Sequence, residues 1–271
     1  MRKAVMTIAG SDPGGGAGIQ QDIKVFTCLG LYSCAAITAL TVQNTQGVKA
    51  VEPVSPHIVA QQVEAVLEDI DLSGVKLGMM ATEENVEAVA SAFYKKGKCP
   101  VVADPVMRSK NGAVLLSDSA WKQYEEQLLP WVDFLTPNLQ EASFILSMSI
   151  GSVEDMKKAA RAICSMMERK RKSSLAPGVY LKGGHLESSD KSVDVFCYKD
   201  ALELFSSDRI RNVHTHGTGC TLSSAFCGYL ALGHEPFEAA RLAKEFVTMA
   251  IKAGFPLGKG IGPVDPLIFL K

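Results

Sequence analysis

The 271-residue chain carries 28 basic and 29 acidic residues, and 47% of its residues are hydrophobic. A chain of this length can bury a full core, and its formal net charge of −1 gives no indication of a nucleic-acid partner or an anionic membrane. The longest apolar run, at 34–42, is too short to span a membrane, and the N-terminal one is too short for a signal sequence. Seven cysteines without a C-x-x-C pair favour a reducing, cytoplasmic location.

Short β-rich runs alternate with helical patterns along the chain. Helical spacing of apolar residues predicts helices over 55–70 and 82–96, the second beginning at Thr82. The alternation predicts an α/β domain with a mostly parallel sheet that is covered by helices on both faces. Such sheets bind ligands at the carboxyl ends of their strands. We expect strands at 3–10, 34–42, 75–80, 100–106, 132–138, 179–184 and 192–198.

Domain organisation follows from the absence of a linker or an internal repeat, which predicts one domain over 1–271. The basic segment 169–178, "RKRKSSLAPG", lies between a helical pattern and a strand. Its Ser, Pro and Gly content favours a solvated loop insertion, with a phosphate-binding patch as the alternative.

A glycine-rich segment, "IAGSDPGGGAGIQQDIKVF" at 8–26, follows the first expected strand. It is not a P-loop, because Ala17, Gly18 and Ile19 stand where a Lys and a Ser or Thr would be needed. The dinucleotide-binding fingerprint also fails, because it requires a third glycine at position 19. Two interpretations remain, a tight turn or a backbone brought close to a ligand.

Two acidic residues follow later strands. Asp104 lies at a carboxyl end in "VVADPVM", where a magnesium–nucleotide site would use a carboxylate. Asn138 and Glu141 in "TPNLQEA" form an N-x-x-E pattern that is typical of a helix capping box. On this pattern alone the cap is the better explanation of Glu141, and a Mg²⁺-binding carboxylate is the alternative.

The segment "HTHGTGCTLSSAF" at 214–226 places a cysteine at the first turn of an apolar helix. N–H groups of Gly217, Thr218 and Gly219 could cradle the negative charge of a transferring phosphoryl group. Cys220 would then lie beside that cradle. The alternative is a small residue that packs a helix start, as we expect of Cys227.

Together these motifs resemble the hydroxymethylpyrimidine/phosphomethylpyrimidine kinases of thiamine biosynthesis, members of the ribokinase-like superfamily. The pattern extends in order to about Pro263. The resemblance implies a three-layer α/β/α sandwich, a homodimer, and two successive ATP-dependent phosphorylations of a small pyrimidine. It also leads us to expect no fused thiamine-phosphate synthase domain. The segments that carry it are "AGSDPGGGAGIQQDIK", "ITALTVQNTQGV", "GMMAT", "DPVM", "TPNLQEA", "LKGGH" and "HTHGTGCTLSSA".

The resemblance also implies roles for particular residues. Gly217, Thr218, Gly219 and Cys220 would form the anion hole, with Cys220 where sugar kinases carry a catalytic Asp. Asp104 and Glu141 would serve Mg²⁺ and the phosphates of ATP. The remaining nucleotide-side residues would be Asn138, Lys182 and His214, with His216 nearby. The pyrimidine pocket would be formed by Gln43, Asp22, Gly10, Ala17, Val42, Met79 and Val106.

Alternatives remain open at this point. Pyridoxal and pyridoxine kinases phosphorylate a hydroxymethyl group on a similar ring, and a dual activity is possible within the superfamily. A cysteine acyl transferase would use Cys220 as nucleophile with His214 or His216 as its base. A third alternative is a non-catalytic ligand-binding protein, against which Asp104 and Glu141 argue. For Cys220 itself we expect partial ionisation at neutral pH, because the helix start favours the thiolate and ATP opposes it.

Overall fold

The computed structural model describes residues 2–93, 99–107, 116–184, 186 and 190–270. They form one sheet of nine strands in the order β3-β2-β1-β4-β5-β6-β7-β8-β9. The strands are β1 (Ala4–Ser11), β2 (Tyr32–Asn44), β3 (Gly47–Pro53), β4 (Leu72–Leu77), β5 (Val101–Ala103), β6 (Phe134–Leu135), β7 (Gly178–Leu181), β8 (Lys191–Tyr198) and β9 (Ala201–Asp208).

The central part of this sheet is parallel. Strands β2, β1, β4, β5, β6 and β7 pair in parallel, whereas β3, β8 and β9 are antiparallel additions at the two edges. The mostly parallel sheet is therefore confirmed, and each of the seven expected strands is present. The sequence interpretation missed β3 and β9, whose residues are largely exposed or half-buried.

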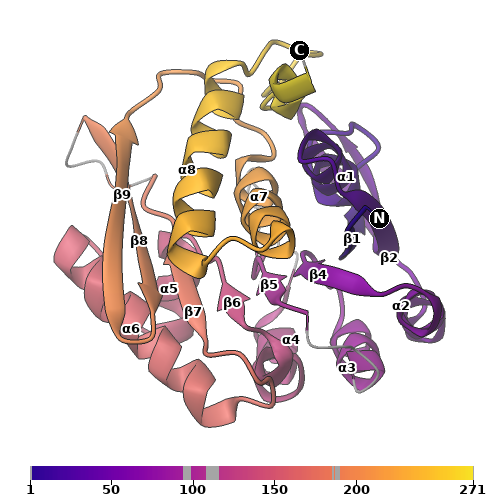
Figure 1. The fold of residues 1–271 in the computed structure, drawn as a ribbon. Helices are drawn as coiled ribbons and strands as arrows, with labels where there is room; N and C mark the ends of the chain where they lie inside the picture. The colour runs from indigo at the N-terminus through magenta and orange to yellow at the C-terminus, as the bar shows by residue number, and fades with distance from the viewer. Residues whose placement is uncertain (1, 94–98, 108–115, 185, 187–189, 271) are drawn as a thin grey trace.

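Helices cover both faces of the sheet, as the alternating pattern predicts (Figure 1). Helices α1, α7 and α8 pack together on one face around a core that includes Phe26, Phe226 and Phe246. The other helices lie on the opposite face over a second core. The helices of the described residues are α1 (Gly18–Cys28), α2 (Pro56–Asp69), α3 (Glu83–Ala92), α4 (Asp118–Gln123), α5 (Leu139–Leu146), α6 (Val153–Lys170), α7 (Thr218–Leu232) and α8 (Pro236–Lys252).

The helix boundaries mostly follow the sequence signals. Thr82 caps α3 by accepting a hydrogen bond from the Asn85 N–H, and the expected end of that helix at 94–96 lies outside the described residues. The expected loop at 169–178 is partly wrong, because Arg169 and Lys170 complete the last turn of α6. Basic residues suit a helix C-terminus, and Lys170 also pairs with Glu125 at 2.9 Å.

The parallel strands bring several loops to one edge of the sheet. β1, β4, β5, β6 and β7 all end on this side, and the loops that follow them carry Asp12, Met79, Asp104, Asn138 and Lys182. In the described part of the chain, no helix has both the length and the apolar character needed to cross a membrane.

Candidate active site

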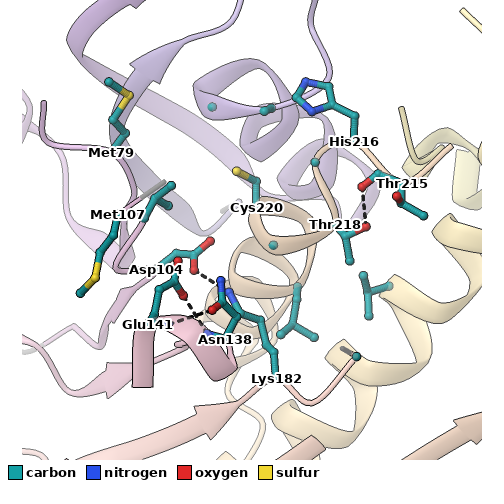
Figure 2. A pocket seen from close by; sticks show the side chains of 18 of the residues that line it. Met79, Asp104, Met107, Asn138, Glu141, Lys182, Thr215, His216, Thr218 and Cys220 are labelled. Atoms are coloured by element: carbon teal, nitrogen blue, oxygen red, sulfur yellow. Dashed lines mark hydrogen bonds and ion pairs between the residues drawn. The ribbon is translucent and has the colours of Figure 1, made fainter. Parts of the chain in front are cut away.

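A cavity of about 830 Å³ opens at the carboxyl ends of the parallel strands. Its walls come from the glycine-rich segment, β2, the loops after β4 to β7, and the start of α7 (Figure 2). The structure thus gathers most of the expected site residues around one space. These are Gly10, Ala17, Gln43, Met79, Asp104, Val106, Asn138, Glu141, Lys182, Gly217, Thr218, Gly219 and Cys220.

Three expected residues do not line this cavity, and the sequence-based expectation is corrected for them. Asp22 is fully buried behind the cavity, because its face of α1 turns toward the sheet and pairs with Lys76. Val42 is 56% exposed, because successive residues of β2 alternate between its two faces. The ring of His214 points into the neighbouring loop, where its Nδ1 accepts a hydrogen bond from the Gly262 N–H.

The start of α7 is shaped by glycine. Gly217 has φ +82°, and a Cβ there would lie 1.8 Å from the carbonyl oxygen of Gly16, so a side chain is excluded on two grounds. Thr218 donates its hydroxyl to the carbonyl oxygen of Thr215 at 2.8 Å, which holds the turn closed. The first-turn N–H groups of α7 lack partners within the helix and carry partial positive charge. They suit an anion.

Opposing charges meet directly beside this helix start. A Cβ on Gly219 would lie 3.2 Å from Asp104 Oδ2 and 3.5 Å from Lys182 Nζ. Lys182 Nζ in turn donates to Asp104 Oδ1 at 2.7 Å. Figure 2 shows Asp104, Lys182 and Glu141 close together below Cys220. The cavity therefore combines a cation, two carboxylates and a helix N-terminus, which is the chemistry that phosphate groups require.

Glu141 takes part in the capping box that the sequence predicts. Its N–H donates to Asn138 Oδ1 at 2.9 Å, and its Oε2 accepts from the Asn138 N–H at 2.7 Å. The carboxyl group also lines the cavity. Burial raises the pKa of Glu141 to about 7, with Asp104 adding to the rise and Lys182 opposing it. Its cap role is confirmed, and its charge is poorly compensated in the protein alone.

The donor set can accommodate a divalent cation bound with phosphates. Among the described residues, no group of three or more His, Cys, Asp and Glu side chains is close enough to hold a metal by itself. Mg²⁺ takes few protein ligands and keeps water and phosphate oxygens in its shell. Two carboxylates, one of which is Glu141 with a raised pKa that a bound cation would lower, fit that requirement.

Sequence reasoning assigned no role to two polar residues that line the cavity, Lys76 and Asp12. Lys76 is fully buried on β4 and bonds both carboxylate oxygens of Asp22, at 3.0 and 2.8 Å. Asp12 is buried and accepts hydrogen bonds from the N–H groups of Gly14, Gly16 and Ala17. His216, which the sequence analysis places near the nucleotide, pairs with Asp12 at 3.0 Å. A lone lysine within the apolar run "VKLGMM" was the available signal for Lys76.

The environment of Cys220 differs from the sequence-based expectation of partial ionisation. Burial raises the pKa of the Cys220 thiol to about 11. The charge of Lys76 and the N–H of Gly18 lower this pKa, whereas Asp22 and Asp104 raise it. Burial therefore outweighs the lowering by Lys76 and Gly18, which keeps the pKa of the thiol above neutral pH.

This pKa makes a direct prediction for alkylation of Cys220 by iodoacetamide. Only the thiolate reacts, so a thiol with a raised pKa should react about tenfold faster for each unit between about pH 7 and 9. Peptide mass spectrometry resolves the Cys220 rate from those of the other cysteines, and Cys220→Ser identifies its signal. A rate that levels off by about pH 8 would contradict the raised pKa.

Comparisons with known proteins extend this geometry. The family model for phosphomethylpyrimidine kinase matches residues 12–265. A hydroxymethylpyrimidine/phosphomethylpyrimidine kinase of Mycobacterium tuberculosis is 41% identical, covering 98% of this chain and 94% of its own length. The thiamine biosynthesis bifunctional protein ThiED of Geobacter sulfurreducens is 43% identical over 98% of this chain, which spans only 53% of that longer protein.

Solved structures agree on the fold. The phosphomethylpyrimidine kinase of Clostridium difficile superposes with a TM-score of 0.79 at 40% identity, covering 93% of this chain and all of that one. The ADP complex of Bacillus subtilis pyridoxal kinase superposes with a TM-score of 0.87 at 33% identity, and both chains are covered completely. The α/β architecture is thus the ribokinase-like fold. The family match over most of the chain, together with full-length relatives, shows that this protein belongs to the phosphomethylpyrimidine kinase family.

Proposed function

We propose that the protein transfers a phosphoryl group from ATP to the hydroxymethyl group of 4-amino-5-hydroxymethyl-2-methylpyrimidine, and then phosphorylates the monophosphate. Relatives with this name cover the whole chain at about 40% identity, which supports the substrate class. The structural observation that carries the proposal is the start of α7 lying against Asp104 and Lys182. That arrangement lies in the same cavity as Gln43 and Met79.

In this proposal the pyrimidine lies at the β1–β2 side of the cavity. Gln43 would hydrogen-bond the ring edge, and Met79 and Val106 would supply apolar walls. Gly10 lies so close to Met79 that a Cβ there would be 3.2 Å from its sulfur, which keeps this wall flat. The hydroxymethyl group would then face Cys220 and the start of α7.

The transferring phosphoryl group would lie over the first turn of α7. N–H groups of Gly217, Thr218 and Gly219 would hold its charge, and the helix dipole would add to their effect. Cys220 would orient the attacking hydroxyl, and its thiolate form, a small fraction near pH 7, would accept the hydroxyl proton late. A small thiolate fraction suffices because phosphoryl transfer depends mainly on positioning and charge stabilisation.

ATP would occupy the side of the cavity formed by Asn138, Lys182 and α8. Pyridoxal kinase neighbours solved with ADP or AMP-PCP support nucleotide binding on this fold. Asp104 and Glu141 would hold Mg²⁺, which when bound neutralises phosphate charge. Lys182 could exchange its ion pair with Asp104 for one with the phosphates of ATP, because carboxylate and phosphate oxygens both accept hydrogen bonds from an ammonium group.

Pyridoxal phosphorylation is the second candidate. The pyridoxal kinase of Staphylococcus aureus, solved with AMP-PCP and pyridoxal, superposes with a TM-score of 0.85 at 34% identity over 98% of this chain and 94% of its own. Pyridoxal and the hydroxymethylpyrimidine are both alcohols on a flat heteroaromatic ring, and they are similar in size. The same cavity could therefore accept pyridoxal as a second substrate.

We also propose that the protein is a cytoplasmic homodimer. All seven cysteines are free, which suits a reducing compartment. Leu40 and Val42 of β2 are more than half exposed and lie on one face of the strand, and they give an apolar surface near the sheet edge that a second copy could cover.

The test measures ADP release with Mg-ATP and one alcohol at a time. The alcohols are the hydroxymethylpyrimidine, its monophosphate, pyridoxal and pyridoxine. Turnover with both pyrimidines is the expected result. Turnover with the B6 vitamers alone would replace the proposed function by its alternative, and turnover with none would reject both.

A further inference from the structure

His216 occupies a position between two side chains that the reaction does not by itself explain. Its Nε2 atom lies 3.0 Å from Asp12 Oδ2 and 3.3 Å from Gln43 Nε2. The residue directly precedes Gly217, so the same turn that begins α7 also places this imidazole. Figure 2 shows the ring at the end of the cavity beyond Cys220.

His216 is held through both its backbone and its ring. The His216 N–H donates to the Gly262 carbonyl at 3.1 Å, and the His216 carbonyl accepts from the Val264 N–H at 3.0 Å. A Cβ on Gly16 would lie 2.4 Å from His216 Cδ2, so the imidazole rests directly on the glycine-rich backbone. Such a ring cannot turn away without moving two loops.

His216 Nε2 faces both Asp12 and Gln43. Whether this nitrogen carries a proton therefore decides whether it donates or accepts in each contact. Asp12 Oδ2 already accepts from the N–H groups of Gly16 and Ala17, at 3.1 and 3.0 Å. Burial alone would raise the pKa of Asp12, but the hydrogen bond from His216 and these backbone bonds lower it. An ionised carboxylate only accepts, so His216 Nε2 must donate. Gln43 Nε2 is the amide atom nearest this donor, so the amide must be turned by 180° to present its oxygen, and the single Nε2–H is then shared between Asp12 and that oxygen.

This orientation satisfies the other end of the amide as well. The Thr41 hydroxyl donates to the Ser11 carbonyl at 3.0 Å, and Thr41 Oγ1 lies 3.3 Å from Gln43 Oε1, the position that the amide nitrogen takes once the amide is turned. Thr41 Oγ1 can therefore accept one amide N–H of Gln43. The second N–H remains for a ligand, because Gln43 lines the cavity.

We infer that His216 is a positioning residue for Gln43. Held by Asp12, it fixes the Gln43 carbonyl and leaves an N–H facing the bound ring, so the site selects rings that present an acceptor such as an aromatic nitrogen. The inference rests on the proposed function, in which Gln43 binds the ring.

Steady-state kinetics with the hydroxymethylpyrimidine test this role through three variants. His216→Phe keeps a ring but removes the donor, and should raise the KM for the pyrimidine roughly tenfold with little change in the KM for ATP. His216→Gln returns an N–H near the Nε2 position and should recover much of that loss. Gln43→Ala should raise the same KM by itself.

The double variant Gln43→Ala/His216→Phe separates positioning from a general structural role. If His216 acts through Gln43, the double variant should have the same KM as Gln43→Ala, because the two effects are not independent. Additive losses, or an unchanged KM in His216→Phe, would overturn the inference while wild-type turnover still supports the proposed function. If the wild-type protein does not phosphorylate the pyrimidine at all, both fail.

Discussion

Replacing Cys220 with alanine is expected to lower kcat for the pyrimidine by about 100-fold or more, the usual cost of losing a positioned proton acceptor. The thiol lies at the start of α7, beside the cation and carboxylates that would bind the phosphates. Its removal leaves the N–H groups of Gly217, Thr218 and Gly219 in place. Nucleotide affinity, measured by calorimetry with ADP, should therefore stay within about threefold of wild type, a span of under 1 kcal/mol.

Cys227 supplies the matched control for this experiment. It lies two turns further along α7, is fully buried in the core, and faces Gly74. Cys227→Ala should lower stability and leave kcat nearly unchanged. Near-normal kcat in Cys220→Ala would remove this thiol from the mechanism, whereas equal losses in both variants would indicate damage to α7 instead.

Replacing Lys76 with methionine is expected to lower the free energy of unfolding by about 3–5 kcal/mol. The Lys76 and Asp22 side chains are both 0% exposed, and Thr7 and Ser224 also donate to Asp22. Without the ammonium, Asp22 keeps a buried negative charge that these hydroxyls only partly compensate. Urea-induced unfolding measures the loss.

An exposed pair provides the control for Lys76. Lys157 bonds Glu154 at 2.6 Å on the surface of α6, where their side chains are 31% and 71% exposed. Lys157→Met should change the free energy of unfolding by less than about 0.5 kcal/mol, because surface ion pairs contribute little. If the Lys76 and Lys157 variants lost similar stability, the buried Lys76–Asp22 pair would not contribute more to the free energy of unfolding than a surface pair.

Sequence alone predicts the parallel core because its strands carry unbroken apolar runs that end in Gly, Asp, Pro or Asn. The edge strands β3 and β9 are harder to find, since they mix charged and apolar residues and depend on pairing with β2 and β8. The end of α6 shows the same limit. Polar composition indicates exposure at Arg169 and Lys170, and an exposed last turn of a helix has that composition too.

Some residues of the site can be predicted from the sequence and others cannot. Residues that lie after a strand, such as Asp104, or at the start of a helix, such as Glu141 and Gly217, leave a local signal in the sequence. The side chain of Asp22 has no such signal, because its direction depends on a partner 54 positions away in Lys76. His216 resembles any loop histidine until the fold brings Asp12 and Gln43 to it. Long-range pairing of this kind requires the structure.

The most direct test of the two-step kinase follows the products rather than ADP. Purified protein is incubated with excess Mg-ATP and the hydroxymethylpyrimidine, and the phosphorylated pyrimidines are identified by mass spectrometry over time. The proposed function predicts that the monophosphate appears first and is then converted to the diphosphate, with two ATP consumed per pyrimidine. A reaction that stops at the monophosphate, or that yields no phosphorylated pyrimidine, would contradict it.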